Sequence, residues 1–323
     1  MKCTMSLPLD RYTLGEYAGW DDLRRELDEL GCGGIEGIWG GEELPRDIPT
    51  GLVVGYHLTF FHDWLDLYRE DRTALERKFG SMENVRAFYG GTDRETLLAA
   101  YRADLERAAA LKPEYVVFHV SDVSVEEGYT YRWLHSHEEV IDTSAEVINA
   151  LLAGRDWPFV FLVENQWWPG FTFTDPRLTG RLLEGIKFED KGILLDTGHL
   201  MNTCPDLRTQ EEGAAYISAM LDAHGDLAKL IKGIHLHQSL SGEYVRARTG
   251  FLPDGLPDDP VERFGASYRH IQRVDQHRPW SDPAVLSLLE RISPRWVTHE
   301  LSAGDRAKRA EAVRRQSALL GRG

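Results

Sequence analysis

The chain has few cysteines and no long hydrophobic run. Its 323 residues include three cysteines, Cys3, Cys32 and Cys204, and no Cys-x-x-Cys spacing, which excludes a disulfide framework and a structural zinc knuckle. No apolar stretch is long enough to span a bilayer, and residues 1–8 lack the apolar segment of a secretory signal. We therefore expect a cytoplasmic protein that does not insert into a membrane.

Basic residues are also scarce, and the common nucleotide-binding motifs are missing. Lys and Arg total 37 against 52 Asp and Glu, so the formal net charge is -15, and such a surface repels phosphate backbones and anionic lipid. No Gly-x-Gly-x-x-Gly turn follows the first expected strand, and the chain has neither a phosphate-binding loop nor a Gly-x-Ser-x-Gly elbow. We expect no nucleotide cofactor and no nucleic-acid partner.

Short β-type runs alternate with amphipathic helical stretches along the whole chain, a pattern typical of βα units around a parallel sheet. The expected strands are residues 2–7, 34–39, 52–59, 115–120, 159–164, 192–196, 231–237 and 296–301. The helical stretches include residues 94–111, 137–152, 210–227 and 305–319. About eight such units without a linker predict one domain, 1–323, with the α/β fold of a (β/α)8 TIM barrel. A doubly wound open sheet is the alternative.

Two connections are too long to be ordinary turns. They run from residue 60 to about 93, after the third expected strand, and from residue 238 to about 280, after the seventh. In a barrel, both would lie on the face formed by the carboxyl ends of the strands, where active sites are built. We expect them to form lids or substrate walls.

Six expected strands end in a side chain that can bind a metal ion. A barrel gathers the ends of its strands at one face, so these side chains should converge there: His57, His119, Glu164, Asp196, His235 and Glu300. A single histidine at a strand end is usually structural, but packing has no use for so many imidazoles and carboxylates in one place. Together they form a ligand set for Zn²⁺, Mn²⁺ or Fe²⁺.

The order of βα units, together with the motif Asp-Thr-x-His at residues 196–199, resembles the xylose isomerase-like barrels, a superfamily that includes endonuclease IV. The resemblance covers the whole chain, and the ligand pattern is closest to the endonuclease branch, AP endonuclease family 2, in which nine residues hold three zinc ions. It implies two or three divalent metal ions here. The implied ligands are His57, His119 and Glu164 for the first metal, Glu164, Asp196, His235 and Glu300 for the second, and His199, Asp275 and His277 for the third.

The third of these sites depends on Asp275 and His277, which lie about forty residues beyond the seventh expected strand. A solvated turn is the alternative interpretation of this pair. His237 has the same strand parity as the ligand two residues before it and is a reserve candidate. His299 precedes Glu300 directly and should therefore face the helices.

Two or three metal ions a few ångströms apart can clamp the attacking and leaving oxygens of a phosphoryl centre. The resemblance therefore implies a metal-dependent hydrolase, a multinuclear phosphodiesterase or phosphoesterase, with Glu164 and Glu300 as catalytic residues. The main alternative is a single-metal, Mn-type sugar isomerase or epimerase, in which the same two glutamates shuttle protons at adjacent carbons. His57, His119 and the pair after the seventh strand favour the hydrolase, because a one-metal epimerase does not need them. A lyase and a binding protein also stay open.

The expected substrate is a small anionic or sugar-like molecule. Trp167 and Trp168 directly follow the Glu164-Asn165 pair and can form a flat wall for a ring. Arg246 and Arg278, in the second long connection, can bind a phosphate or carboxylate. DNA is not the expected substrate, because loops that embrace DNA should be rich in Lys and Arg.

Overall fold

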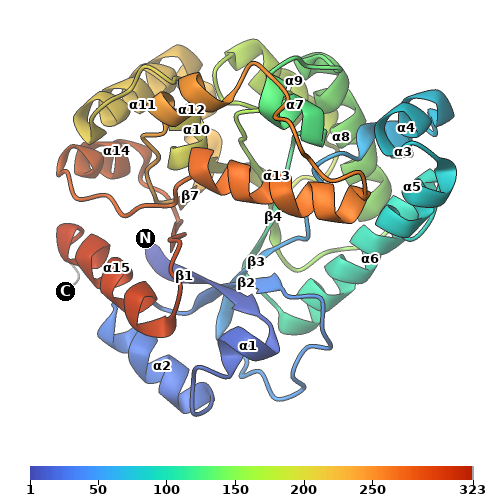
Figure 1. Cartoon of the computed structure of the whole chain (residues 1–323). Coiled ribbons are helices and arrows are strands. Elements are labelled where there is room, and N and C mark those ends of the chain that lie inside the picture. Colours follow the sequence, from blue (N-terminus) through green and yellow to red (C-terminus); the bar gives the residue numbers. More distant parts are fainter. Residues whose placement is uncertain (322–323) are drawn as a thin grey trace.

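Eight parallel strands close into a barrel in chain order in the computed structural model, which describes residues 1–321 (Figure 1). The strands are β1 (Lys2–Leu9), β2 (Ile35–Trp39), β3 (Val53–His57), β4 (Tyr115–His119), β5 (Val160–Glu164), β6 (Lys191–Asp196), β7 (Ile231–His235) and β8 (Trp296–His299). Because β1 pairs with both β2 and β8, the sheet has no edge. The predicted TIM barrel is confirmed, and the open-sheet alternative is wrong.

The helices between the strands form the outer layer of the barrel (Figure 1). They are α2 (Trp20–Glu29), α6 (Arg94–Leu111), α8 (His137–Leu152), α9 (Pro176–Gly185), α11 (Gln210–His224), α14 (Ala284–Ile292) and α15 (Arg306–Leu319). α8 and α11 begin with capping boxes, at Ser136 and Thr209, which satisfy the free N–H groups of the first turn. α11 ends three residues before its predicted end, where Gly225 takes a φ of +52°, and a 3₁₀ helix, η1 (Gly225–Leu230), follows.

The barrel interior below the strand ends is filled by side chains. A cluster of buried residues packs there, consisting of Val54, Tyr115, Val117, Val160, Leu162, Leu194 and Trp296. Tyr115 fits against β3 only because residue 55 is a glycine, since a Cβ at this position would lie 2.2 Å from the Tyr115 ring. The polar side chains at the strand ends therefore stand on an apolar floor and not over an open channel.

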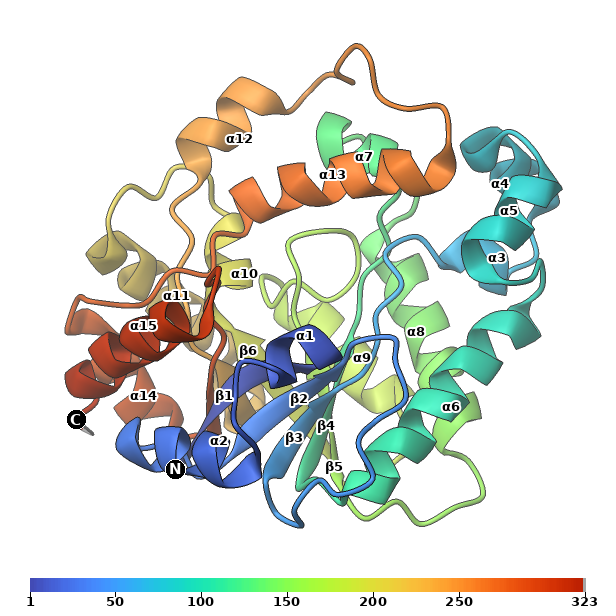
Figure 2. The ribbon, with the colours of Figure 1, turned by 60° about the horizontal axis from the view of Figure 1, so that its bottom comes forward.

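The two long connections carry helices of their own, over the carboxyl-end face of the barrel. The β3–α6 connection contains α3 (Leu65–Tyr68), α4 (Arg72–Phe79) and α5 (Met82–Tyr89), and the β7–α14 connection contains α12 (Gly242–Arg248) and α13 (Pro260–Val274). Figure 2 shows α13 crossing this face, next to α7 (Val125–Thr130). No helix within residues 1–321 combines the length and the apolar character that a membrane span needs.

Candidate metal centre

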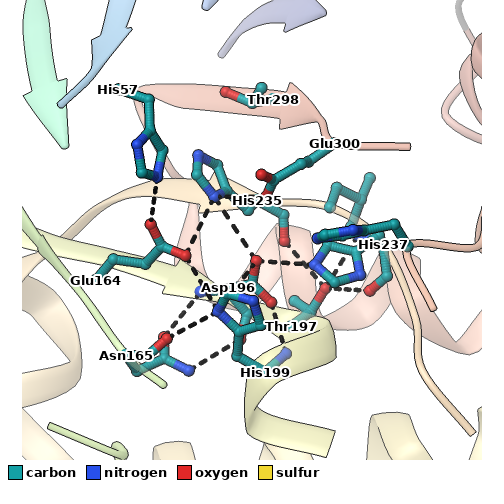
Figure 3. A network of polar contacts seen from close by, with 12 residues as sticks. His57, Glu164, Asn165, Asp196, Thr197, His199, His235, His237, Thr298 and Glu300 are labelled. Atoms are coloured by element: carbon teal, nitrogen blue, oxygen red, sulfur yellow. Dashed lines mark hydrogen bonds and ion pairs between the residues drawn. The ribbon is translucent and has the colours of Figure 1, made fainter. Parts of the chain in front are cut away.

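The predicted metal ligands converge at the carboxyl ends of the strands, in three groups. Within each group, every residue offers one ligand atom, and these atoms lie within 4.8 Å of one another. The first cluster is His57, His119 and Glu164; the second is Glu164, Asp196, His235 and Glu300; the third is His199, His237, Asp275 and His277. All nine residues predicted as ligands belong to these clusters, and the reserve residue His237 joins the third. Figure 3 shows His57, Glu164, Asp196, His199, His235, His237 and Glu300.

In the first cluster, two imidazoles and a carboxylate face one another. The Nε2 atoms of His57 and His119 are 3.0 Å apart, and each lies 3.2 Å from Oε2 of Glu164. Nδ1 of His57 lies 2.8 Å from the carbonyl oxygen of Leu58. Because that oxygen can only accept, Nδ1 carries the proton and Nε2 turns its lone pair toward the cluster.

The second cluster is richer in carboxylates. Nδ1 of His235 lies 2.8 Å from Oε2 of Glu300, 3.5 Å from Oε1 of Glu164 and 3.6 Å from Oδ2 of Asp196. Glu164 thus directs one oxygen to each of the first two clusters, as a bridging ligand would. On the outer side of the ring, Nε2 of His235 is 2.8 Å from Oε1 of the fully buried Glu36. Glu36 therefore fixes the imidazole tautomer that leaves Nδ1 free.

The Asp-Thr-Gly-His motif connects the second cluster with the third. Asp196 ends β6 and is also the N-cap of the short helix α10 (Thr197–Asn202), where its Oδ1 accepts a hydrogen bond of 2.6 Å from the His199 amide. The cap places His199 in the first turn of the helix, with its ring above the strand ends. Nε2 of His199 then lies 3.1 Å from Oδ2 of Asp275, and Nε2 of His277 lies 3.0 Å from the same oxygen. The solvated-turn interpretation is wrong for Asp275, which is buried.

Several inward atoms of the clusters lack the hydrogen bonds that their burial calls for. Among residues 1–321, Nδ1 of His237 is buried without a hydrogen-bond partner. Four other inward atoms contact oppositely charged groups of the clusters as ion pairs but make no hydrogen bond of good geometry: Oε1 of Glu164, Nδ1 of His235, Nε2 of His277 and Oε2 of Glu300. Buried polar atoms are normally satisfied, because an unpaired one costs about 1–3 kcal/mol. Imidazole nitrogens and carboxylate oxygens that point at a shared position fit divalent transition-metal ions.

Without cations, the clusters hold protons. Burial opposes a charge on His235, but the carboxylates of Glu300, Glu36 and Glu164 outweigh burial and raise its pKa well above the ordinary value. Burial likewise opposes ionisation of Glu300, yet the imidazoles of His235 and His277 lower its pKa to about 2. The site is therefore a set of ionised carboxylates that needs positive charge, from protons or from metal ions.

The other predicted residues differ in how close they lie to the clusters. The ring of Trp167 is 5.1 Å from that of His199, centroid to centroid, and Trp168 packs with Trp167 in a small apolar cluster below α13. The structure brings neither arginine to the clusters: Arg246 is exposed and donates to the Pro205 carbonyl, and Arg278 is exposed in a surface pocket that contains no cluster residue.

Two aromatic side chains from the first long connection also border the site, although no motif in the sequence pointed to them. Phe60 stacks on His119 with a centroid distance of 4.6 Å. Next to it, His62 contacts Trp168 and Phe264 edge to face, and burial lowers the pKa of His62 to about 3, so this imidazole is neutral. His299, as expected, turns away from the site, toward α15.

No protein-family model and no curated protein matches the sequence. Among solved structures, endonuclease IV from Thermus thermophilus is similar, with a TM-score of 0.55, 17% identity and 100% coverage of both chains. A D-tagatose 3-epimerase-like protein has a TM-score of 0.53 and 15% identity over 99% of this chain and 97% of that one. A 3-keto-D-glucoside 4-epimerase from E. coli has a TM-score of 0.50 and 14% identity over 99% of each chain. The chain therefore has the same barrel fold as these endonuclease and epimerase structures.

Proposed function

We propose that this protein is a metal-dependent hydrolase that cleaves a phosphoester or phosphodiester bond in a small anionic substrate. The observation that carries the proposal is the grouping of ten potential ligands into three clusters. A one-metal epimerase would use the second cluster alone. The first and third clusters, with five imidazoles between them, have no role in such an enzyme.

The side chains have separable tasks in this proposal. Glu164, with one oxygen toward each of two clusters, would hold two ions at a fixed separation. Divalent ions bound there would supply Lewis-acid activation of a water nucleophile and neutralise the charge of a phosphoryl group. Glu300 has the most exposed carboxylate of the second cluster, with 16% of its side chain accessible. Its pKa of about 2 keeps it ionised, which suits a metal ligand and makes it neither a proton donor nor a strong base.

The surroundings of the clusters favour a small substrate over DNA. α13 crosses the carboxyl-end face of the barrel (Figure 2), so a duplex would meet this helix before it met the clusters. The net charge of -15 also opposes the approach of a polyanion. Phe60, His62 and Trp167 present neutral aromatic surface next to the ligands, which suits a sugar or another ring in the substrate.

A single-metal sugar epimerase is the second candidate. The second cluster supplies the two glutamates that this reaction needs, Glu164 and Glu300, with Asp196 and His235 as the remaining ligands. Two epimerase-type structures have the same fold at TM-scores of 0.53 and 0.50. Fold alone does not decide the reaction, because unrelated activities share this barrel architecture.

Metal content and hydrolysis, measured on the same preparations, test the proposal. Protein purified without chelator should contain two or three transition-metal equivalents and hydrolyse bis(p-nitrophenyl) phosphate. Glu164→Gln should abolish turnover under either candidate function, whereas His57→Ala should abolish it only for the hydrolase. His137→Ala is a control, because this imidazole bonds to the Gly170 backbone outside the clusters. A His57→Ala protein with full metal content and full activity would overturn the hydrolase.

A further inference from the structure

Among residues 1–321, His62 is the one histidine whose ring makes no polar contact with the protein. The sequence contains 12 histidines, and in the structure each of the others forms a hydrogen bond or an ion pair through a ring nitrogen. His62 is half-buried, and its backbone is fixed, because its carbonyl oxygen accepts a hydrogen bond of 2.7 Å from the Val123 amide. Both ring nitrogens therefore stay available to water or to a ligand.

Three aromatic side chains, which we call the collar, contact this imidazole edge to face: Phe60, Trp168 and Phe264. Their ring centroids lie 4.9, 5.9 and 5.1 Å from that of His62. They come from three separate segments, which are the β3–α6 connection, the loop after β5, and α13. The collar thus holds the imidazole by packing and leaves its nitrogens unused.

The collar adjoins the accessible side of the first cluster. Phe60 stacks on His119 with a centroid distance of 4.6 Å. Of the three side chains in that cluster, His119 is the most accessible, at 15%, against 2% for His57 and 1% for Glu164. A catalytic metal ion with three protein ligands keeps an open position for water or substrate. A molecule bound at such a position would reach it past His119, beside Phe60 and His62.

We infer that His62 is a substrate-binding residue, which hydrogen-bonds a ring hydroxyl in the organic part of the substrate while the phosphoryl group lies at the first cluster. The substrate is then a phosphoester of a ring that carries hydroxyl groups, as in a sugar phosphate, and not a simple alkyl or aryl ester. The inference rests on the proposed function only in that an anionic substrate binds at the metal clusters.

The charge state of His62 determines which group it can bind. Burial, with a contribution from nearby His119, lowers the pKa of His62 to about 3, so the ring is neutral at pH 7. A neutral imidazole offers one N–H donor and one acceptor nitrogen, and it does not attract a second anion. Metal ions at the first cluster would repel a cationic group. A hydroxyl, which both donates and accepts, can pair with either tautomer.

An apolar group in the same place would be disfavoured. It would displace water from the imidazole without replacing the hydrogen bond, and a site built to bind a hydroxyl discriminates against an analogue that lacks one. Trp168 and Phe264 add apolar surface against which ring carbons can pack. The polar contact and the apolar surface together favour a hydroxylated ring.

Binding of two matched ligands tests the inference on protein purified without chelator. Glucose 6-phosphate carries ring hydroxyls, and cyclohexylmethyl phosphate has a six-membered ring without them. In isothermal titration, His62→Leu should raise the Kd for glucose 6-phosphate about tenfold, the effect of one lost hydrogen bond, and change the Kd for cyclohexylmethyl phosphate by less than about twofold. His62→Gln keeps a donor and an acceptor, so its Kd for glucose 6-phosphate should stay within about threefold of wild type.

Phe61→Leu is the matched control, because this neighbouring ring packs against Tyr101 of α6, with a centroid distance of 5.3 Å. It should leave both Kd values within about twofold of wild type, and elemental analysis should find the wild-type metal content in all three variants. Equal changes of the two Kd values in His62→Leu would overturn the role of His62, as would a failure of His62→Gln to retain binding. A wild type that binds glucose 6-phosphate no tighter than inorganic phosphate would overturn it as well.

Hydrolysis of bis(p-nitrophenyl) phosphate separates this inference from the proposed function. Absence of hydrolysis, together with a selective loss of glucose 6-phosphate binding in His62→Leu, would overturn the hydrolase and leave the role of His62 standing. Hydrolysis by a protein in which His62→Leu changes both Kd values equally would do the reverse.

Discussion

Replacement of Glu36 by Gln should weaken metal binding at the second cluster, although Glu36 is not itself a ligand there. Its carboxylate is fully buried and accepts three hydrogen bonds, from His235 at 2.8 Å, Tyr115 at 2.6 Å and Thr298 at 3.0 Å. The glutamine amide keeps one acceptor oxygen but loses the negative charge. Its NH₂ group would face the Tyr115 and Thr298 hydroxyls, which donate to the carboxylate in the wild-type protein. The imidazole of His235 then donates to a neutral amide oxygen in place of a carboxylate, so the hydrogen bond that fixes its tautomer is weaker.

The size of the effect follows from the contact that is lost. A hydrogen bond to a charged group contributes about 1.5–3 kcal/mol, and partners behind a metal-bound histidine change metal affinity by about 10–100-fold. We expect a loss in this range for one metal equivalent, measured by competition with a chromophoric chelator. The ¹⁵N shifts of the His235 ring should show a mixture of tautomers in the metal-free variant.

Asp104→Asn is the matched control for the loss of a buried carboxylate. Asp104 is as buried as Glu36 and also accepts a hydrogen bond of 2.6 Å from a tyrosine, Tyr56, but it lies on α6 in the outer layer. This variant should lower stability and leave metal affinity unchanged. A Glu36→Gln protein that binds all metal equivalents as tightly as wild type would refute the role of Glu36, as would an equal loss of affinity in both variants.

Three further changes have definite expected outcomes. Gly198→Ala should displace the buried ring of His237, because the new Cβ would lie 2.1 Å from its Cε1. We expect the stability of the protein to fall by about 1–3 kcal/mol and elemental analysis to find one zinc equivalent less. Metal affinity should rise with pH across neutrality, by about tenfold per pH unit for each proton that the metal displaces. The reason is that neighbouring carboxylates raise the pKa values of His199 and His235 well above normal despite burial. An affinity that does not change between pH 6 and 8 in isothermal titration would contradict this. Asp122→Asn should stabilise the protein by about 1–3 kcal/mol at pH 8, by less at pH 5 and not at all below about pH 4. Burial raises the pKa of this carboxyl to about 7, and a raised acid pKa costs stability only above the unfolded value. Unchanged thermal unfolding at pH 8 would count against it.

The strands were predictable because each is buried on both faces and reads as an apolar run. All eight were placed within about two residues of their observed ends. The helices of the two long connections were not, because short helices such as α3 and α12 depend on tertiary packing more than on propensity. The sequence indicated only that these segments lie on the carboxyl-end face.

The grouping of the candidate ligands was predictable because barrel topology turns six strand ends into neighbours. Glu36 was not, since it lies three residues before the end of β2 and acts across the barrel through His235. The alternation of side chains along a strand predicted that His237 could point inward, as His235 does. Its distance from Asp275 and His277 was not predictable, because it depends on the path of a connection of about forty residues. The path of this connection also places Arg246 and Arg278 away from the clusters. The contacts of an exposed arginine depend on the tertiary structure and cannot be predicted from its position in the sequence.

Because Glu164 is shared by two clusters, the number of metal sites can change in evolution through few substitutions. The second cluster contains a full set of ligands by itself, while the first adds only two histidines from neighbouring strands and the third uses separate residues. Loss of His57 and His119 together with the residues after α13 would leave a mononuclear centre on an unaltered barrel. The number of ligands can therefore increase or decrease stepwise. On this barrel, a few substitutions separate a mononuclear metal site from a multinuclear one.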